Sequence, residues 1–308
     1  MASVTMPTDL QLVASSSRGG PSTGHSIALI CGGGTLPGAV AGAIARRGLR
    51  PVMFAIRGWA DPKVVERHAH HWIALGQAGR FLRLARAEQC REGLFIGALL
   101  RPPISKIRLD WHTIRLMPRI VRAFHGGDDR LLSGIARLLE EEGVRIISVA
   151  EIAPEILVPE GVLGRHQPSA RDRADIACAL QMIAALGPFD VGQAAVVAHN
   201  HVLAVEASEG TDNMLNRLVE LRGQRRVTTA PGTGVLVKAP KPGQDRRFDL
   251  PAIGPQTVAN AARAGLGGIA VAAGSAIIAE PAEMIAAADR AGLFLVGVAA
   301  DGAGGGTR

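Results

Sequence analysis

The stretch SIALICGGGTLPGAVAGAIARRGLRPVMFAI at residues 26–56 contains the pattern of a strand, a turn, a helix and a second strand. The apolar residues 27–30 predict a buried strand, and residues 36–47 predict a helix with Thr35 as its N-cap. Residues 51–56 predict the next strand. Two buried strands joined by a helix form a parallel βαβ unit, so the chain is predicted to open as a Rossmann-like α/β fold.

Helices and strands continue to alternate along the rest of the chain. In the first half, helices are predicted at 79–90 and 128–142, and strands at 93–99 and 144–149. In the second half, helices are predicted at 170–186, 211–222, 255–264 and 281–291. Two strands are predicted between 190 and 207, and others at 235–239, 268–273, 277–278 and 293–298.

The two halves are separated by a segment that is typical of a linker. Residues 154–170 contain three prolines and no sustained periodicity. We therefore predict two α/β domains, at residues 26–158 and 159–300. Residues 1–25 and 301–308 are rich in small residues, which predicts flexible tails.

Composition narrows the class of protein. Hydrophobic residues make up 47% of the chain and charged residues 20%, which indicates a globular core. Aromatic residues are only 3%, which argues against a stacking platform for single-stranded nucleic acid. The net charge of +7 favours anionic partners, and phosphates, acidic lipid headgroups and nucleic acids all remain open at this point.

Cysteine usage and hydropathy predict a cytoplasmic protein. Cys31, Cys90 and Cys178 are odd in number and form no CxxC pair, so neither a disulfide framework nor structural zinc is expected. No run of 18 apolar residues is present, and the first residues lack the pattern of a signal peptide. The protein is expected to be at most peripheral to a membrane.

The turn CGGGTLPG at 31–38 is the first candidate for a binding site. It follows a strand and opens a helix, so its backbone N–H groups can face an anion at the helix N-terminus. It is not a dinucleotide fingerprint, because Pro37 stands where a third glycine would be required. A purely structural turn is the alternative, but we favour contact of the Gly33 and Gly34 backbone with phosphate or sugar.

The second candidate is the loop KAPKPGQDRRFDLPAIGPQ at 238–256, which combines four basic residues, two aspartates and four prolines. The prolines restrict the backbone, so little of the loop can be helical. A stiff basic loop that carries Asp249 suits an anionic substrate, whereas a proline-rich connection with solvated charges is the structural alternative. In the functional interpretation the basic residues neutralise phosphate. They are Lys238, Lys241, Arg246 and Arg247.

Carboxylates and histidines provide further candidates. The GDD motif at 127–129 contains either a helix N-cap or a metal ligand. Glu206, Glu209 and Asp212 follow one strand and together offer the oxygen ligands that Mg²⁺ prefers, although Thr211 can also cap the next helix. The motif HAHH at 68–71 is expected to form a solvated face and HNH at 199–201 the tip of a hairpin.

Several segments, taken in order, resemble the LpxI family of UDP-2,3-diacylglucosamine pyrophosphatases of lipid A biosynthesis. The segments are GGGTLP at 32–37, ADP at 60–62, RP at 101–102, GDD at 127–129, EEEGVRIISVAEIAPEILVPEGVLG at 140–164, DVGQAAVV at 190–197, LAVEASEGTD at 203–212, KAPKPGQDRRFDLPAIGPQTV at 238–258 and GLFLVGV at 292–298. Each is weak alone, but the order and spacing are specific. Three departures are the additional N-terminal tail, the variable hairpin at 199–201 and the segment 101–118, of which only the opening RP and the closing LMP are kept strongly.

The resemblance implies a magnesium-dependent hydrolase that splits UDP-2,3-diacylglucosamine into 2,3-diacylglucosamine 1-phosphate (lipid X) and UMP. It also implies a substrate cleft between two α/β domains, where an Ala- and Leu-rich groove can hold the acyl chains. The family's catalytic aspartate in the FDLP motif corresponds to Asp249. With the candidates above, the expected substrate-binding residues are Gly33, Gly34, Thr35, Arg101, Lys238, Lys241 and Arg247. The expected metal ligands are Asp249, Asp212, Glu209 and Asp128.

The expected partners follow from the same resemblance. They are a lipid-linked nucleotide sugar and the anionic cytoplasmic face of the inner membrane, to which a basic protein is attracted. No nucleic-acid partner is expected, since that interpretation depends only on the charge, and a homodimer is left open. The alternative function is a non-catalytic carrier or sensor of a nucleotide sugar or lipid phosphate.

Overall fold

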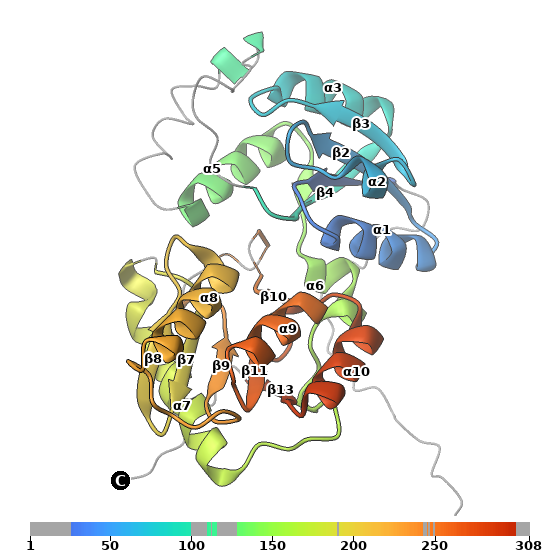
Figure 1. The fold of residues 1–308 in the computed structure, drawn as a ribbon. Helices are drawn as coiled ribbons and strands as arrows, with labels where there is room; N and C mark the ends of the chain where they lie inside the picture. Colours follow the sequence, from blue (N-terminus) through green and yellow to red (C-terminus); the bar gives the residue numbers. More distant parts are fainter. Residues whose placement is uncertain are drawn as a thin grey trace, which may run out of the picture.

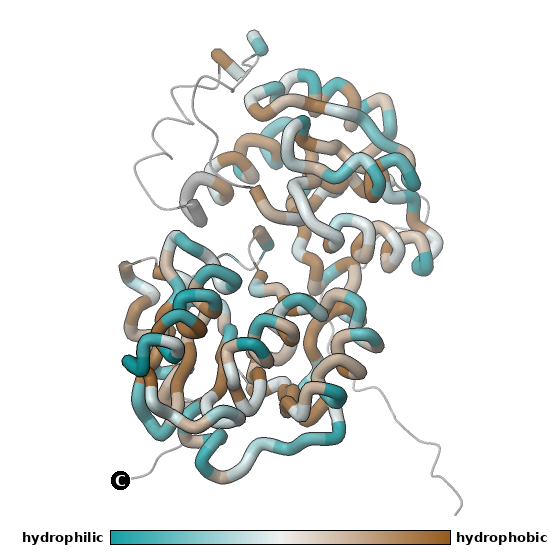
Figure 2. Tube along the Cα trace, viewed as in Figure 1, coloured by the Kyte–Doolittle hydropathy of each residue, from teal (hydrophilic) through white to brown (hydrophobic). Residues whose placement is uncertain are grey.

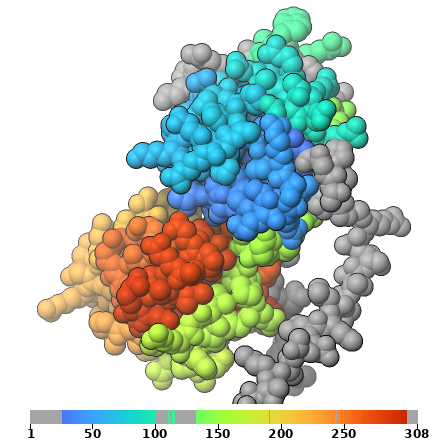
Figure 3. All heavy atoms as spheres, turned by 90° about the vertical axis from the view of Figure 1, so that its right-hand side faces the viewer, coloured from blue at the N-terminus to red at the C-terminus, as the bar shows by residue number. Residues whose placement is uncertain are grey.

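The protein consists of two α/β units stacked on one another, as Figures 1 and 3 show from two sides. The structure is a computed structural model. It describes residues 26–99, 110, 111, 113–115, 128–189, 191–242, 245, 247, 248 and 250–299. Each unit has its own sheet with helices on both faces, which confirms the predicted fold class.

The N-terminal unit is built on a five-stranded parallel sheet with the order β3-β2-β1-β4-β5. The strands are β1 (Ser26–Cys31), β2 (Arg50–Ile56), β3 (Ala69–Ile73), β4 (Cys90–Ile96) and β5 (Arg145–Ile146). The helices are α1 (Leu36–Arg46), α2 (Pro62–Val65), α3 (Ala78–Ala87), α5 (Asp128–Glu141) and α6 (Val149–Ile152), followed by the 3₁₀ turn η2 (Pro154–Ile156).

Alternating side chains of β1 explain why helices cover both faces of this sheet. Ile27 and Leu29 pack in one buried cluster with Ile44 of α1. Ala28 and Ile30 point to the other face and pack with residues of α3 and α5. Since successive residues of a strand face opposite sides, a continuously apolar strand such as β1 requires cover on both.

The C-terminal unit contains a six-stranded mixed sheet with the order β6-β13-β11-β9-β7-β8. The strands are β6 (Gly161–Val162), β7 (Ala194–Ala198), β8 (His201–Val205), β9 (Val235–Lys238), β11 (Gly268–Ala272) and β13 (Phe294–Val298). The helices are α7 (Ala170–Leu186), α8 (Gly210–Gly223), α9 (Pro255–Arg263) and α10 (Pro281–Ala291), with the 3₁₀ turn η3 (Gly187–Phe189) after α7. Figure 2 shows the apolar strands inside and polar residues on the outer helices.

The two faces of this sheet are covered unequally. Helices α8, α9 and α10 pack on one face and share one buried cluster, whereas α7 packs alone on the other. Helix α7 begins with a capping box, in which the Ser169 hydroxyl accepts a hydrogen bond from the Asp172 amide and the Asp172 carboxylate accepts one from the Ser169 amide. This local signal fixes the start of α7 at the residue where the sequence predicts it.

A short parallel ribbon connects the two units. It is formed by β10 (Ala252–Ile253) and β12 (Ile277–Ile278). Ile277 belongs to the buried cluster of the N-terminal unit and Ile278 to that of the C-terminal unit. The main chain of Leu157 also bridges to Ile277. The segment that carries β10 is therefore held against both units.

Four local predictions in the N-terminal unit were wrong. The strand expected at 144–149 is limited to β5, because Ser148 and Glu151 form a capping box that starts α6. The helix expected at 79–90 ends at Ala87, and β4 begins at Cys90 instead of Gly93. The HAHH motif is not simply a solvated face, since most of it forms the edge strand β3.

Cys31, Cys90 and Cys178 are all free thiols, and burial raises the pKa of Cys31 to about 12. In the part of the chain that the structure describes, no helix is long and apolar enough to cross a bilayer.

Candidate active site

The glycine turn after β1 lies where the order of the first sheet reverses. In the order β3-β2-β1-β4-β5, the chain moves to one side of β1 and then to the other. The main chain of Gly33 pairs with that of Ala98, which follows β4: the Gly33 amide donates to the Ala98 carbonyl at 2.7 Å and the Ala98 amide to the Gly33 carbonyl at 3.0 Å. Open α/β sheets bind ligands at this reversal, beyond the carboxyl ends of the strands.

Two glycines are required by this close pairing. A Cβ atom on Gly32 would lie 2.3 Å from the carbonyl oxygen of Ala98. A Cβ atom on Gly97, whose φ is +94°, would lie 2.6 Å from the carbonyl oxygen of Gly33. The glycines therefore allow the turns after β1 and β4 to touch.

The backbone amides of the glycine turn differ in their hydrogen bonding. The Gly33 amide donates to the Ala98 carbonyl, while Gly33 itself lines the interdomain pocket, and its contact with phosphate or sugar stays a prediction. Gly34, with φ of +90°, Thr35 and Leu36 donate no hydrogen bond from their amides to any residue that the structure describes. Thr35 occupies the N-cap position as predicted, but its side chain makes no capping hydrogen bond. These donors belong to the positive end of α1.

A pocket of about 470 Å³ lies between the two units at this helix terminus. From the N-terminal unit it is lined by residues 33–36 and Ala98, and from the C-terminal unit by residues 252–257, Ala279 and Glu280. Residues 254–257 are the start of α9, so the N-termini of α1 and α9 both border the pocket. Each of the two helices has a proline in its first turn, which is favourable at this position.

A second pocket, of about 220 Å³ and almost wholly apolar, adjoins the glycine turn from the N-terminal unit. Gly32 and Gly97 line the apolar pocket, while the next residues, Gly33 and Ala98, line the interdomain pocket. Further lining comes from strands β1 to β4, from residues 74–77, from α3 and α5, from Leu99 and Thr113, and from Phe248 of the basic loop. The apolar pocket is therefore built mainly from the N-terminal unit, with Phe248 contributed by the basic loop, and the acyl-chain groove expected between the domains stays a prediction.

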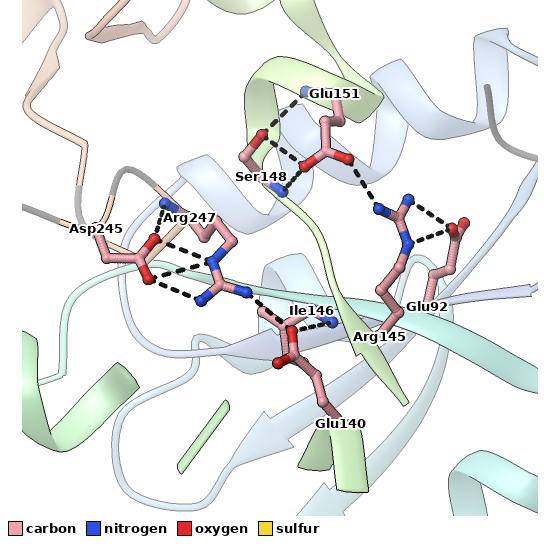
Figure 4. A network of polar contacts seen from close by, with 8 residues as sticks. All are labelled: Glu92, Glu140, Arg145, Ile146, Ser148, Glu151, Asp245 and Arg247. Carbon is pink, nitrogen blue, oxygen red and sulfur yellow. Dashed lines mark hydrogen bonds and ion pairs between the residues drawn. The ribbon is translucent and has the colours of Figure 1, made fainter. Parts of the chain in front are cut away.

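The basic loop reaches across to the N-terminal unit through Arg247, as Figure 4 shows. Its guanidinium donates to both carboxylate oxygens of Asp245 and, at 2.8 Å, to Oε1 of Glu140 on α5. It also lies 4.9 Å from the centre of the Phe248 ring. The hydrogen bond from Arg247 lowers the pKa of Asp245, and the same bond raises the pKa of Arg247. Arg247 is thus engaged in holding the loop, and its contact with substrate stays a prediction.

A neighbouring group of ion pairs holds the segment that follows Glu140, which contains β5 and the start of α6. Arg145 donates to Glu92 at 2.8 Å and to Glu151 at 3.1 Å, and Glu151 caps α6 together with Ser148 (Figure 4). The amide of Ile146 donates to Glu140. The N-terminal unit therefore presents an ordered polar surface to the basic loop.

The other expected basic residues have different environments. Lys238, at the end of β9, is 9% exposed, and its Nζ donates at 3.0 Å to the carbonyl of Ala252, which lines the interdomain pocket. Lys241 is half-buried. Arg101 and Arg246 lie outside the described residues.

Asp249, the expected catalytic residue, also lies outside the described residues, but both of its chain neighbours are described. Phe248 lines the apolar pocket. Leu250 packs against the buried cluster of the N-terminal unit, and Ala252 lines the interdomain pocket. The chain on either side of Asp249 thus borders the two pockets.

The expected group of metal ligands at 206–212 is not assembled. Glu206 accepts hydrogen bonds from the Gln193 amide and from Thr211, which is therefore not the helix cap. Glu209 pairs with Arg217, and Asp212 accepts from Asn260. Among the residues that the structure describes, no three His, Cys, Asp or Glu side chains lie close enough to hold a metal ion. The side chain of Asp128 lies outside that description.

The histidine motifs have structural roles. His199 and Asn200 have φ of 55° and 58° and form the tight turn between β7 and β8, as predicted. Their amides donate to Asp175 of α7. In the HAHH motif, His71 Nε2 lies 2.7 Å from Oε1 of Glu88. This acidic neighbour is 17 residues away in the chain and was not expected from the sequence.

Among the contributors to the interdomain pocket that were not identified from the sequence as site residues, Thr257 and Glu280 have polar side chains. Thr257 belongs to a helix whose start was predicted, but nothing in the sequence places that start opposite Gly34. Glu280 precedes α10 with φ of 51°, and a hydrogen bond shared with Glu283 raises its pKa. A non-glycine residue with positive φ beside a pocket is a structural signal that a sequence does not carry.

Similarity to known proteins extends over both units. The family model of the LpxI N-terminal domain matches residues 26–156, and that of the LpxI C-terminal domain matches residues 159–296. A curated protein of Caulobacter vibrioides, named UDP-2,3-diacylglucosamine pyrophosphatase LpxI, is 39% identical over 274 residues, which cover 89% of this chain and 98% of the relative. Because both domains match in order and the relative is covered almost completely, this chain belongs to the LpxI family.

Proposed function

We propose that this protein is a hydrolase that cleaves the pyrophosphate bond of UDP-2,3-diacylglucosamine and releases lipid X and UMP. The observation that carries the proposal is the junction of two unlike pockets at the glycine turn. One pocket is bordered by two helix N-termini, and the other is apolar. A substrate with a charged diphosphate and attached acyl chains matches this division, and the relative's name supports it.

The interdomain pocket has the properties that a diphosphate requires. Backbone N–H groups and the positive ends of α1 and α9 favour negative charge. The hydroxyls of Thr35 and Thr257 provide further hydrogen-bond donors at its wall. Because one helix comes from each unit, a bound diphosphate contacts both, which suits the orientation of a phosphoryl group for attack.

The apolar pocket supplies the binding energy for acyl chains. Its lining includes Phe81, Phe95 and Phe248, whose burial against a hydrocarbon chain is favourable. This interaction lies away from the reacting bond and orients the substrate at the turn. The hydrogen bond from Arg247 to Glu140 of α5 holds the adjacent Phe248 in the wall of this pocket.

Asp249 is proposed as the group that activates or orients the attacking water. It is the residue of the FDLP motif, and its neighbours border both pockets. A carboxylate that accepts a proton from water while a phosphoryl oxygen is stabilised by fixed donors is an arrangement typical of phosphoryl transfer.

Magnesium is proposed as the cofactor. Mg²⁺ is usually held by one or two carboxylates together with phosphate oxygens of the substrate, which fits a pocket that Glu280 lines and Asp249 neighbours. Bound there, the ion would neutralise charge on the diphosphate. Asp128, Glu209 and Asp212 stay candidates from the sequence, the last two with other partners in this structure.

The direct test is release of UMP from UDP-2,3-diacylglucosamine by the purified protein. We expect turnover with MgCl₂ and its loss with EDTA, because charge on the diphosphate would then be left uncompensated. A carrier or sensor would bind the same substrate and release no UMP. Failure to release UMP under conditions in which the Caulobacter relative is active would refute the proposal.

A further inference from the structure

An exposed apolar group lies at the mouth of the apolar pocket. Trp111 is 81% exposed, Ile114 45% and Leu99 40%, and these are three of the five large hydrophobic side chains most exposed in the described part of the chain. Leu99 and Thr113 line the pocket itself, so Trp111 and Ile114 flank its wall. Large apolar side chains that stay in water beside a binding pocket indicate an interaction surface.

The segment that carries Trp111 is held firmly at the start of α3. The Asp110 carboxylate accepts hydrogen bonds from the Thr113 amide at 2.8 Å, the Thr113 hydroxyl at 2.7 Å and the Arg80 amide at 2.9 Å. The Thr113 hydroxyl oxygen accepts a bond from the Ala78 amide. Asp110 and Thr113, on either side of Trp111 in the sequence, are therefore anchored to the start of α3.

The charge around this apolar group is positive. Arg80 and Arg83 lie exposed on α3, and Arg115 is exposed next to Ile114. Within the described residues none of the three makes an ion pair. The Asp110 carboxylate, which precedes Trp111, keeps its negative charge while it accepts hydrogen bonds from Thr113 and the Arg80 amide, and the three arginines outnumber it. In Figure 1 this segment stands at the end of the molecule remote from the C-terminal unit. An apolar tip within a cationic surface matches an anionic bilayer.

We propose that Trp111 and Ile114, with Arg80, Arg83 and Arg115 around them, form the surface by which this protein docks on an anionic phospholipid membrane. This inference rests on the proposed function, since it places the mouth of the acyl pocket at the lipid surface from which a diacylated substrate must be extracted. Tryptophan is favoured at the boundary of water and hydrocarbon, and the arginines are attracted to the lipid headgroups. The bilayer then faces the apolar pocket directly.

Sedimentation with vesicles that contain no substrate tests the docking surface separately from catalysis. Vesicles of phosphatidylglycerol and phosphatidylcholine are compared with vesicles of phosphatidylcholine alone. Replacement of both apolar residues, by Trp111→Ser and Ile114→Ser, is expected to weaken binding to the anionic vesicles by about tenfold or more. Arg80→Gln with Arg83→Gln is expected to weaken it by about thirtyfold and to leave binding to neutral vesicles unchanged.

The matched control is Phe189→Ser, which removes an aromatic side chain that is 76% exposed on the C-terminal unit. It is expected to bind vesicles as the wild type does. Release of UMP from substrate in detergent micelles reports the proposed function and the folding of each variant independently of vesicle binding. If the wild type does not bind anionic vesicles, or if Trp111→Ser with Ile114→Ser binds them as tightly as the wild type, the docking surface is refuted even when hydrolysis in micelles is normal.

Discussion

At the scale of single residues, the site depends on how closely two turns approach. Gly32 and Gly97 have no side chains, and their neighbours Gly33 and Ala98 exchange two backbone hydrogen bonds. This contact separates the interdomain pocket from the apolar pocket. Glycine is needed at Gly97 for two reasons, since its φ is positive and the space for a Cβ atom is filled.

The effect of positive φ and the effect of the missing space at Gly97 can be separated. The loss of stability on replacing Gly97 is compared with the loss on replacing Gly48, which has a positive φ but free space for a Cβ atom. Gly97→Ala is expected to destabilise the protein by about 2–4 kcal/mol, because it adds a clash to the strain of positive φ. Gly48→Ala, at φ of +75° with nothing within 4 Å of the added atom, bears only the strain of about 1 kcal/mol. Urea unfolding measures both, and equal losses would show that the turns can separate freely.

At the scale of helices and strands, the hairpin of β7 and β8 is attached to α7 by one buried carboxylate. Asp175 is 1% exposed and accepts hydrogen bonds from the amides of His199 at 3.0 Å and Asn200 at 2.6 Å. Both turn residues have positive φ, which is costly for residues other than glycine. The carboxylate stabilises the strained turn from outside the hairpin.

Removal of that carboxylate has a predictable cost. Asp175→Ala removes a buried carboxylate that accepts from two turn amides and is expected to lower the free energy of unfolding by about 2–4 kcal/mol. Asp172→Ala, one turn earlier on the same helix, removes only a capping interaction and is expected to cost about 1 kcal/mol. Chemical denaturation of the two variants provides the comparison. A smaller loss for Asp175→Ala than for Asp172→Ala would contradict the role assigned to the buried carboxylate.

The elements themselves could largely be predicted from the sequence, because their signals are local. The apolar run of β1, the capping residue Ser169 and the proline at the start of α10 each act within a few residues. Short elements could not be predicted this way. Strand β5 has two residues, and β10 pairs with β12 across the 23 residues between Ile253 and Ile277.

The site could be predicted only in part, since its parts come together through tertiary contacts. The glycine turn and the basic loop were identified from composition and spacing. Sequence position did not show that Ala98 occupies the Gly33 amide, that Glu140 holds Arg247, or that α9 begins opposite α1. It also suggested that the carboxylates of 206–212 act together, whereas each has its own partner in the fold.

At the scale of the whole molecule, the two units each contribute one helix terminus to the interdomain pocket. The ribbon of β10 and β12 and the ion pair between Arg247 and Glu140 hold the basic loop against the N-terminal unit. Neither unit alone contains both walls of the pocket. The proposed hydrolysis is therefore a property of the assembled chain, and its center is the loop that carries Asp249.

The most direct test of this account compares the wild type with Asp249→Ala on UDP-2,3-diacylglucosamine, with UMP release and substrate affinity measured on the same preparations. Loss of a general base is expected to lower kcat by about 10²–10⁴-fold. Substrate affinity is expected to change little, because the helix termini and the apolar pocket are intact. A variant that hydrolyses the substrate with the kcat of the wild type would contradict the central role of this loop.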